Sequence, residues 1–550
     1  MKRKWVIVCC LLYTLAASFY RTYGPKGTDY VLPPLPPAEN WLLLPLDGRP
    51  PCKDFTVQLG ALGGTTFTVP PDALMDHYEK PANIPALKTW VQANLPRQKG
   101  ILLSTDLLLF GGLLQSRLQP LENKQADTFF TYLETLKNSN PDKQFYLFSV
   151  IPRLLITDHL LPDRWYQWQL MTWATNMDKK RQGLPYDKEQ YEDAQQSIPM
   201  ALKWKYLNLY WKNDDFNKAL ITFVTQNNLA DLTIGQDDAQ PYGLPNYNRH
   251  HAVEMVRDLM AHPPIAVSQG ADELGSLAAS RIFCRRIHYQ PQVKICYGSP
   301  EMADYTLHFV PQTLKEIAKD KVQLAGGVLT ESLDTADFIL YIYCGTKDTN
   351  RAAAACREIK ALMDKKPVAL VDLSDRFAAG DCLLPYLAAH NVPLPRLVSY
   401  SGWNTASNAI GTAVAQGTIV TGQAKVLPKA LLPSLYGKNF QFTYARFLDD
   451  WAYQKLIRPR MGTLTPINGM EPEQGVPYVD AATSYTAREL GLYNWIFLCL
   501  CRKFPYYQDG DYAYYLKDVD FHVTLPWGRP FEIRLEVLPK YSRKPLTKQA

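Results

Sequence analysis

Short apolar runs that end in a turn and an acidic residue recur along this chain. A short apolar run bounded by turn signals is typical of a strand buried on both faces. Because loops at the carboxyl ends of parallel strands build the sites of α/β proteins, these acids are expected to converge on one cleft. The runs and their acids are 42–46 before Asp47, 101–103 before Asp106, 232–235 before Asp237 and Asp238, 265–267 before Asp272 and Glu273, and 368–371 before Asp372.

Strands that alternate with helical stretches from residue 41 to about residue 420 predict an α/β fold with mainly parallel strands. The number of units fits a (β/α)-barrel or two doubly wound sheets, and the sequence leaves both open. A helical insertion rich in Trp, Tyr and Lys is expected at about 160–230, where it would cap a site. Alternating strands at 521–525 and 531–537 predict a terminal β-hairpin.

These patterns predict five segments in the chain order. A signal peptide or N-terminal anchor at 1–20 and a Pro-rich tether at 21–40 precede an α/β domain at 41–310. A second, Rossmann-like α/β part is expected at 311–430, because its connections are short. A C-terminal α+β region with the hairpin is expected at 431–550.

The N-terminus has the pattern of an export signal, since Lys2, Arg3 and Lys4 precede an apolar stretch at 5–20. The protein is therefore expected to be exported, and to be secreted, periplasmic or membrane-anchored by an uncleaved N-terminal segment. Peripheral membrane association through the N-terminus is left open. The net charge of +6 is mild for 550 residues and no dense basic patch occurs, so nucleic acid is not expected as a partner. The expected partner is a small-molecule or saccharide substrate, which the 12 Trp and 33 Tyr could contact by stacking.

Asp237 and Asp238 form the sharpest local motif, because Pro241 and Gly243 force a turn directly after them. Two adjacent carboxylates repel each other, so one tends to have a raised pKa. Such a difference between the two pKa values suits a general acid beside a carboxylate that stays ionised. The competing interpretation is structural, with a helix N-cap followed by a solvated acid.

Asp272 and Glu273 precede the helical pattern at 274–286. Asp272 is a good candidate to cap that helix, and Glu273 would interact favourably with its positive end. Because the motif also follows a strand, a direct role in the site is an equally open interpretation.

Polar and aromatic residues near other strand ends are the expected substrate-binding groups. Arginines there could bind polar groups of a substrate or form structural ion pairs. The loop at 401–408 offers Trp403 as a stacking wall, with the amides of Asn404 and Asn408 beside it. The expected binding residues are Asp47, Arg49, Asp106, Arg117, Arg153, Tyr242, Asp272, Trp403, Asn404 and Asn408.

The chain resembles a bacterial family of unknown function, domain-of-unknown-function family 4127. The segments that carry the resemblance run in the family's order along most of the chain. The resemblance implies an exported or envelope-associated bacterial protein, and it implies no particular reaction. The matching segments are Pro45-Leu46-Asp47-Gly48-Arg49-Pro50, Asp106 with Gly111-Gly112 and Ser116-Arg117, Asp237-Asp238 with Tyr242-Gly243, Gly270-Ala271-Asp272-Glu273, and Gly402-Trp403-Asn404-Thr405 with Asn408.

The leading hypothesis is a hydrolase of glycosidic or related polar substrates. Hydrolysis of a glycosidic bond needs a proton donor and a nucleophile or base, usually both carboxylic, and Asp237, Asp238 and Glu273 are the expected catalytic residues. This chemistry requires no cofactor. The sequence leaves open that the same acids hold Mg²⁺, Mn²⁺ or Ca²⁺ in a metal-dependent hydrolase or transferase. It also leaves open a non-catalytic envelope protein that binds a saccharide.

Overall fold

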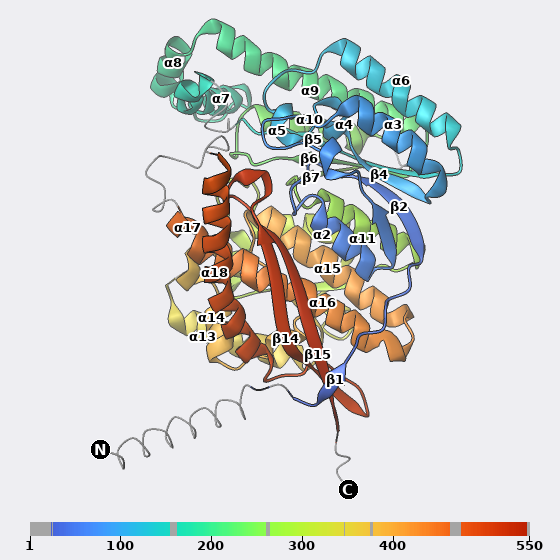
Figure 1. Ribbon diagram of the computed structural model, residues 1–550. Helices are drawn as coiled ribbons and strands as arrows, with labels where there is room; N and C mark the ends of the chain where they lie inside the picture. The colour runs from blue at the N-terminus through green and yellow to red at the C-terminus, as the bar shows by residue number, and fades with distance from the viewer. Residues whose placement is uncertain are drawn as a thin grey trace.

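The computed structural model contains two open parallel sheets that alternate with helices, and an antiparallel sheet near the C-terminus (Figure 1). It describes residues 24, 26–154, 162–259, 265–345, 347–374, 378–461 and 475–546. The α/β prediction is confirmed, and the parallel strands form two separate sheets instead of one closed barrel. Residues 1–20, the expected export signal, lie outside the described residues. No helix within the described ranges is long and apolar enough to cross a membrane.

The first sheet has six parallel strands, and their apolar runs are buried as expected for strands covered on both faces. In chain order they are β2 (Glu39–Leu44), β3 (Thr65–Thr68), β4 (Gly100–Ser104), β5 (Gln144–Ile151), β6 (Asp231–Gln236) and β7 (Ile265–Gln269). Their spatial order is β3-β2-β4-β5-β6-β7, so the order reverses between β2 and β4. Ligands of open α/β sheets bind outside the carboxyl ends of the strands near such a reversal.

Helices cover both faces of this sheet (Figure 1). They include α2 (Asp54–Leu62), α3 (Ile84–Asn94), α4 (Thr105–Leu109), α5 (Leu113–Ser116), α6 (Asn123–Ser139), α9 (Met200–Gln226) and α10 (Leu244–Asp258), whereas α7 (Gln167–Arg181) and α8 (Lys188–Ser197) pack on each other, and α7 contacts α10. Helices α7 to α9 form the predicted helical insertion. Within it, α8 and α9 are separate helices, because Pro199 has an extended backbone at the N-cap of α9 and cannot continue α8.

The second sheet has five parallel strands in the order β12-β11-β10-β8-β9. These are β8 (Gln292–Tyr297), β9 (Val328–Leu329), β10 (Phe338–Gly345), β11 (Val368–Ser374) and β12 (Ser399–Ser401). Because β8 pairs with β10, the second sheet begins earlier along the chain than the boundary expected near residue 310. Helix α11 (Leu274–Arg286) contacts β5 of the first sheet and leads to β8, and the helices that accompany the second sheet are α12 (Leu314–Leu324), α13 (Thr349–Met363), α14 (Leu384–Ala389) and α15 (Ala406–Val426).

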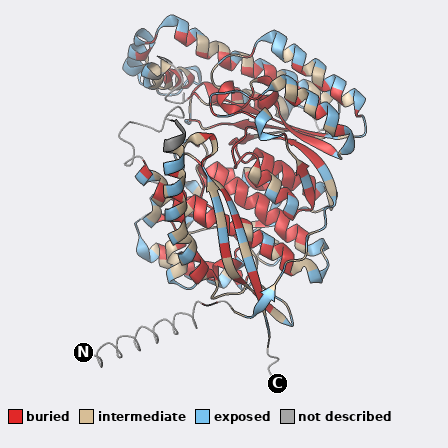
Figure 2. Ribbon diagram, viewed as in Figure 1, coloured by how far each residue is buried: buried red, intermediate tan, exposed pale blue. Residues whose placement is uncertain are grey.

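Helix α15 is the central helix of the core, and its residues from Ala406 to Gln423 are all buried (Figure 2). It contacts β10, β11 and β12 as well as α2, α11 and α12. Its small residues permit this close packing. A Cβ atom added at Gly411 would lie 2.5 Å from Cγ of Glu273, so the helix approaches the first turn of α11 closely.

The C-terminal region completes the fold with helices and the antiparallel sheet. Its elements are α16 (Leu432–Arg446), the π-helical segment η8 (Phe447–Ile457), α17 (Arg458–Met461), α18 (Gly475–Cys501), β13 (Tyr507–Gln508), β14 (Tyr512–Thr524), the turn η9 (Pro526–Gly528) and β15 (Arg534–Pro545). The predicted hairpin is confirmed, with Phe521 opposite Val537. Part of the expected tether is structured, because β1 (Thr28–Tyr30) pairs antiparallel with β15.

Candidate functional site

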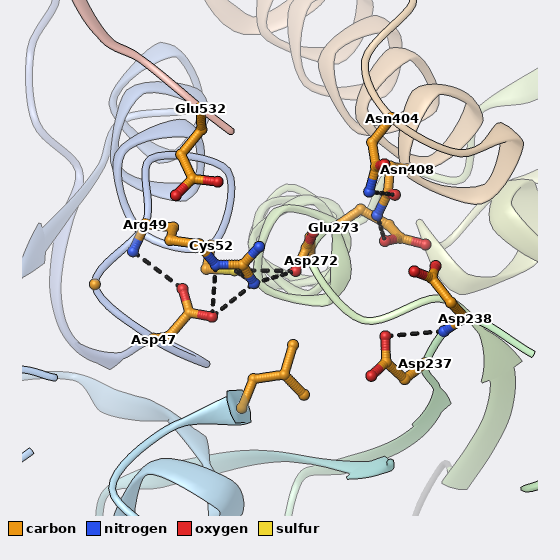
Figure 3. A network of polar contacts seen from close by, with 12 residues as sticks. Asp47, Arg49, Cys52, Asp237, Asp238, Asp272, Glu273, Asn404, Asn408 and Glu532 are labelled. Carbon is orange, nitrogen blue, oxygen red and sulfur yellow. Dashed lines mark hydrogen bonds and ion pairs between the residues drawn. The ribbon is translucent and has the colours of Figure 1, made fainter. Parts of the chain in front are cut away.

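A polar pocket lies at the carboxyl edge of the first sheet, beside the start of α15 and the tip of the C-terminal hairpin (Figure 3). Its empty volume is about 780 Å³, part of it open to solvent. The loops after β2, β6 and β7 supply its acids, as the strand-end pattern of the sequence predicts. Its lining residues are Asp47, Arg49, Leu113, Leu114, Arg117, Arg153, Asp237, Asp238, Gln269, Gly270, Ala271, Asp272, Asn404, Thr405, Asn408, Trp527, Arg529 and Phe531.

Arg49 bridges two buried carboxylates on one side of the pocket. Its Nη2 lies 2.6 Å from Oδ2 of Asp47 and 2.7 Å from Oδ1 of Asp272. Its Nε also donates to Asp47 at 2.9 Å. Burial acts to lower the pKa of Arg49, but Asp272 and Asp47 outweigh burial and raise it well above its usual value. Arg49 therefore stays cationic and fixes the loop after β2 to the loop after β7.

Asp237 and Asp238 are adjacent in the sequence but have different partners. Oδ2 of Asp237 accepts from Nε of Arg117 at 2.8 Å and from the backbone N–H of Arg153 at 3.3 Å, and its Oδ1 accepts from the backbone N–H of Asp238 at 2.8 Å. Oδ2 of Asp238 lies 3.0 Å from Nη1 of Arg153. Asp237 is therefore held more firmly than Asp238.

These partners separate the two acids electrostatically. Burial acts to raise the pKa of Asp237, but Arg117 and Arg153 outweigh it, so the pKa is lowered. Burial and the charge of Asp237 raise the pKa of Asp238 to about 6, against the pull of Arg153. Asp237 is thus ionised near neutral pH, whereas Asp238 can exchange a proton there. Neither acid caps a helix, because the N-cap of α10 is Gly243.

The first turn of α15 supplies the amide groups of the pocket. Thr405 is the N-cap, and its hydroxyl donates to Oδ1 of Asn408 at 2.7 Å. Nδ2 of Asn404 donates to the same oxygen at 3.0 Å. Nδ2 of Asn408 donates to Oε2 of Glu273 at 2.7 Å, so the orientation of this amide is fixed from both ends (Figure 3).

Glu273 does not line the pocket, although it was expected to be catalytic. Its Oε1 lies 2.9 Å from Nζ of Lys321 and accepts from the hydroxyl of Ser407 at 2.7 Å. The side chains of Glu273 and Lys321 are both inaccessible to solvent. Because every one of these contacts holds the carboxylate in place behind Asn408, we assign Glu273 a positioning role.

Most of the other predicted site residues line the pocket: Asp47, Arg49, Arg117, Arg153, Asp237, Asp238, Asp272, Asn404 and Asn408. Asp106 does not line the pocket, and its carboxylate accepts from the backbone N–H of Val150 at 3.0 Å. Trp403 is buried and does not line the pocket, and its ring is nearly perpendicular to that of Phe531, with ring centroids 6.5 Å apart. Tyr242 lies beside α7, with Nζ of Lys179 5.1 Å from its ring centroid.

The capping interpretation of Asp272 is wrong. Helix α11 begins at Leu274, and its N-cap is Glu273, whose side chain makes no capping hydrogen bond. The carboxylate of Asp272 is instead held by Arg49, which the sequence places more than 200 residues away. Burial raises the pKa of Asp272, and Arg49 only partly offsets this effect.

The hairpin tip contributes pocket residues that were not predicted. Trp527 and Arg529 reach the pocket from the turn between β14 and β15, followed by Phe531. Trp527 has a positive φ of 58° and lies against two guanidinium groups, with Cζ of Arg49 at 5.7 Å and Cζ of Arg529 at 4.9 Å. A tryptophan and an arginine in a turn, where small polar residues are usual, are the sequence signal that could have found them.

One cluster has the composition of a metal site. Oxygen atoms of Asp47 and Asp272 and the sulfur of Cys52 lie within 4.8 Å of one another. Nη2 of Arg49 lies against all three, 3.5 Å from the sulfur of Cys52. A guanidinium already supplies the positive charge there, so this donor set does not fit a divalent cation while Arg49 holds this position.

Comparison with known proteins identifies the family. The family model DUF4127, described as a protein of unknown function, matches residues 41–536, so the chain belongs to this family. The resemblance stated from the motifs is confirmed. No curated protein and no solved structure matches the chain.

Proposed function

We propose that this member of family DUF4127 is a hydrolase of glycosidic or related polar substrates, with Asp238 as the general acid. The observation that carries the proposal is the unequal protonation of two adjacent acids in one pocket. Asp238 has a pKa of about 6, whereas the pKa of Asp237 is lowered. A carboxyl group that titrates near neutral pH is suited to donate a proton to a leaving group.

Asp237 is the ionised partner in this proposal. Arg117 fixes its orientation, and its negative charge faces the same pocket as Asp238. When Asp238 protonates the leaving-group oxygen, the glycosidic bond breaks and positive charge develops on the ring, which the ionised carboxylate stabilises. Water then adds to the anomeric carbon and returns a proton to Asp238. Asp47 and Asp272 are the other two carboxylates of the lining, and Arg49 holds both of them.

The pocket chemistry favours a substrate with many hydroxyl or amide groups. Each arginine of the lining is paired with a carboxylate: Arg49 with Asp47 and Asp272, Arg117 with Asp237, Arg153 with Asp238, and Arg529 with Glu532. These pairs offset one another's charge, so the lining offers closely spaced donors and acceptors without a strong field of one sign. Trp527 adds an aromatic surface of the kind against which sugar rings pack.

The test uses the full chain and compares leaving groups. We expect the wild type to hydrolyse at least one member of a panel of disaccharides and 4-nitrophenyl glycosides. Asp238→Asn should lower kcat on disaccharides by roughly 10²- to 10⁴-fold. The same variant should affect 4-nitrophenyl glycosides far less, because 4-nitrophenolate leaves without protonation.

The control is Asp127→Asn, which changes an exposed acid on α6 and should leave both rates unchanged. For the wild type, kcat/KM should fall as the pH rises above about 6, because the general acid is then deprotonated. Equal loss on both substrate types after Asp238→Asn would rule out the acid role. Loss of activity on chelation would favour the metal-dependent alternative, and saccharide binding without turnover would favour a binding protein.

We also infer an exported location from the N-terminal sequence pattern, since Lys2, Arg3 and Lys4 precede an apolar stretch. An extracellular or periplasmic glycan would then be the accessible substrate. Fractionation of cells that produce the full chain, with immunodetection of its C-terminal half, tests this location.

A further inference from the structure

Arg529, at the tip of the C-terminal hairpin, differs from the other arginines of the pocket in where its partner lies. Arg49, Arg117 and Arg153 each pair with an acid that also lines the pocket. Arg529 instead pairs with Glu532, which is 1% exposed and does not line the pocket. A ligand in the pocket therefore meets the cation of this pair and not its anion.

Glu532 occupies only one edge of this guanidinium. Its Oε1 accepts from Nε of Arg529 at 3.2 Å and from Nη2 at 3.1 Å, and its Oε2 accepts from Nη2 at 3.3 Å. Nη1 of Arg529 makes no hydrogen bond to any described residue and is not enclosed by the protein. Because a guanidinium presents five N–H groups in a fixed fork, the edge formed by Nη1 and Nη2 can still bind a second carboxylate.

Three aromatic rings hold this guanidinium in place. Cζ of Arg529 lies 4.8 Å from the ring centroid of Tyr78, 4.9 Å from that of Trp527 and 5.2 Å from that of Phe531. The backbone of the tip is fixed as well, since Nε2 of Gln454 donates to the carbonyl of Phe531 at 3.0 Å. The cation is therefore in position before a ligand arrives, and binding costs little side-chain entropy.

Arg49 provides a second cation on the same tryptophan. Its Cζ lies 5.7 Å from the ring centroid of Trp527, which Arg529 also contacts. Asp47 and Asp272 occupy Nε and Nη2 of Arg49, whereas its Nη1 makes no hydrogen bond within the part of the chain that the structure describes. An anion that binds beside Trp527 is therefore attracted by both arginines.

We propose that Arg529 is a specificity residue that binds a carboxylate of the substrate, so that the substrate class is an acidic saccharide such as a glycoside of a uronic acid. Nη1 and Nη2 of Arg529 bind the carboxylate, and Asp238 protonates the glycosidic oxygen of the same ligand. This inference rests on the proposed function and adds a charged group to its substrate.

The charges of the lining favour a ligand with a single negative charge. The pairs of arginine and carboxylate leave no strong field of one sign over the whole pocket, so the attraction is local to Arg529 and Arg49. The four carboxylates of the lining repel a phosphate ester, which carries a charge of about −1.5 to −2 at neutral pH, more strongly than they repel a carboxylate.

The experiment compares sugars that differ by one carboxylate-bearing group. The full wild-type chain is titrated by calorimetry at neutral pH with matched pairs, which are glucuronate and glucose, galacturonate and galactose, and N-acetylmuramate and N-acetylglucosamine. None of these ligands has a glycosidic bond, so hydrolysis does not interfere. At least one acidic sugar should bind at least about tenfold more tightly than its neutral counterpart.

Variants of the pair formed by Arg529 and Glu532 make the result specific. Arg529→Met alone would leave Glu532 buried without its cation, so it is combined with Glu532→Gln. This double variant should lose the preference for the acidic sugar and bind the neutral sugar as the wild type does. Glu532→Gln alone keeps Arg529 and removes the negative charge behind it, so it should bind the acidic sugar more tightly than the wild type.

Two single substitutions keep the buried carboxylate compensated. Arg529→Lys retains a cation for Glu532 but lacks the planar fork, so it should lower the preference for the acidic sugar by roughly 3-fold or more. Arg543→Met is the matched control. It removes an arginine near the other end of β15, which does not line the pocket, and it should leave every affinity unchanged.

Four outcomes would overturn the carboxylate site. They are absence of binding by every sugar, equal affinity within every pair, an undiminished preference in the double variant, and tighter binding of glucose 6-sulfate than of glucuronate. Preference for an acidic sugar without cleavage of any glycoside would remove the proposed hydrolysis and keep the site. Cleavage of neutral glycosides without this preference would do the reverse.

Discussion

Two buried oxygen atoms beside the first pocket loop, Oδ2 of Asp76 and Oε1 of Gln115, have no hydrogen-bond partner among the described residues. Both oxygens lie close to Gly112, because a Cβ added there would be 2.7 Å from Oδ2 of Asp76 and 3.0 Å from Oε1 of Gln115. The other ends of these side chains are fixed. Oδ1 of Asp76 accepts from the backbone N–H of Gly48 at 2.8 Å, and Nε2 of Gln115 donates to the carbonyl of Tyr78 at 2.9 Å.

A proton on Asp76 would remove the charge of this buried carboxylate and give Oδ2 a hydrogen to donate, and Oε1 of Gln115 is an unpartnered acceptor on the same side of Gly112. Burial and the charge of Asp47 raise the pKa of Asp76 well above its usual value. The folded chain therefore holds this proton over a pH range in which the unfolded chain has lost it. Stability that depends on the proton is complete below the unfolded pKa of about 4 and is lost as the pH rises through the folded pKa.

Asp76→Asn should remove this pH dependence. The amide keeps an acceptor for Gly48 and supplies a permanent donor to Gln115. Urea denaturation from pH 5 to pH 8 gives the free energy of unfolding of both proteins. The free energy of unfolding of the variant should increase relative to that of the wild type as the pH rises. The difference should change by up to about 1.4 kcal/mol per pH unit within the window.

Asp72→Asn is the matched control in the same loop. A hydrogen bond from Lys53 lowers the pKa of Asp72 against a partial burial effect, so this acid is ionised in both folded and unfolded chains above pH 5. Its variant should differ from the wild type by a constant amount from pH 5 to pH 8. A constant difference for Asp76→Asn as well would exclude the shared proton.

At the scale of elements, the strands and the hairpin that could be predicted are those whose formation depends on local sequence patterns. Buried strands such as β4 and β10 were predictable because a short unbroken apolar run bounded by turn signals is typical of a strand covered on both faces. Strand β3 was missed, since Thr65-Thr66-Phe67-Thr68 has no such run and is a strand only because it pairs with β2. The hairpin was predictable from alternation, whereas the insertion of its tip into the pocket depends on contacts far apart in the chain.

The same division applies to the candidate site. Strand-end acids such as Asp47 and Asp237 were predictable, because strand direction alone brings these loops together. The residue that pairs with each of these charged groups could not be predicted from the sequence. Lys321, which pairs with Glu273 outside the pocket lining, lies in the last turn of an amphipathic helix, where a lysine is common and gives no sequence signal of a buried partner.

Helix α7 is attached to the loop that carries Asp238, because the buried carboxylate of Asp178 accepts from the backbone N–H of Gly243 at 2.7 Å. Asp178→Ala removes this acceptor. A hydrogen bond to a charged group contributes about 1.5–3 kcal/mol, so local opening of the loop should become roughly 10- to 100-fold more frequent. Hydrogen–deuterium exchange of peptides that cover 237–244 measures this opening.

Asp187→Ala is the control for that measurement, because Asp187 caps α8 in the same insertion through the backbone N–H of Gln190. It should speed exchange at the start of α8 and leave the 237–244 peptides unchanged. Unaltered exchange of those peptides in Asp178→Ala would mean that other contacts hold the loop.

At the scale of the whole molecule, one buried ion pair joins the two sheets behind the pocket. Lys321 belongs to α12 of the second sheet, and Glu273 follows β7 of the first. Nζ of Lys321 also donates to the hydroxyl of Ser268 at 2.8 Å, within β7 itself. Glu273 in turn accepts a hydrogen bond from Asn408 at the start of α15. The pocket geometry therefore depends on how the two sheets are held together.

Lys321→Met should destabilise the chain strongly, because it leaves the carboxylate of Glu273 buried without its cation. Removal of one partner of a buried pair costs about 3–5 kcal/mol of folding free energy. Urea denaturation at pH 7 measures the loss, provided that both sheets unfold in one transition. Lys425→Met is the control, since Lys425 pairs with Asp337 at the surface and its loss should cost at most about 1 kcal/mol.

A second substitution separates lost charge compensation from lost packing. In Lys321→Met combined with Glu273→Gln, the amide can still bond to Ser407 and Asn408 and carries no charge. The double variant should therefore be more stable than Lys321→Met alone, although it contains one more substitution. If it is less stable, the hydrogen bonds of Lys321 to β7 hold the sheets together, and the charge of Glu273 is secondary. Recovery would show that electrostatic compensation between the two sheets fixes the Asn408 side of the pocket.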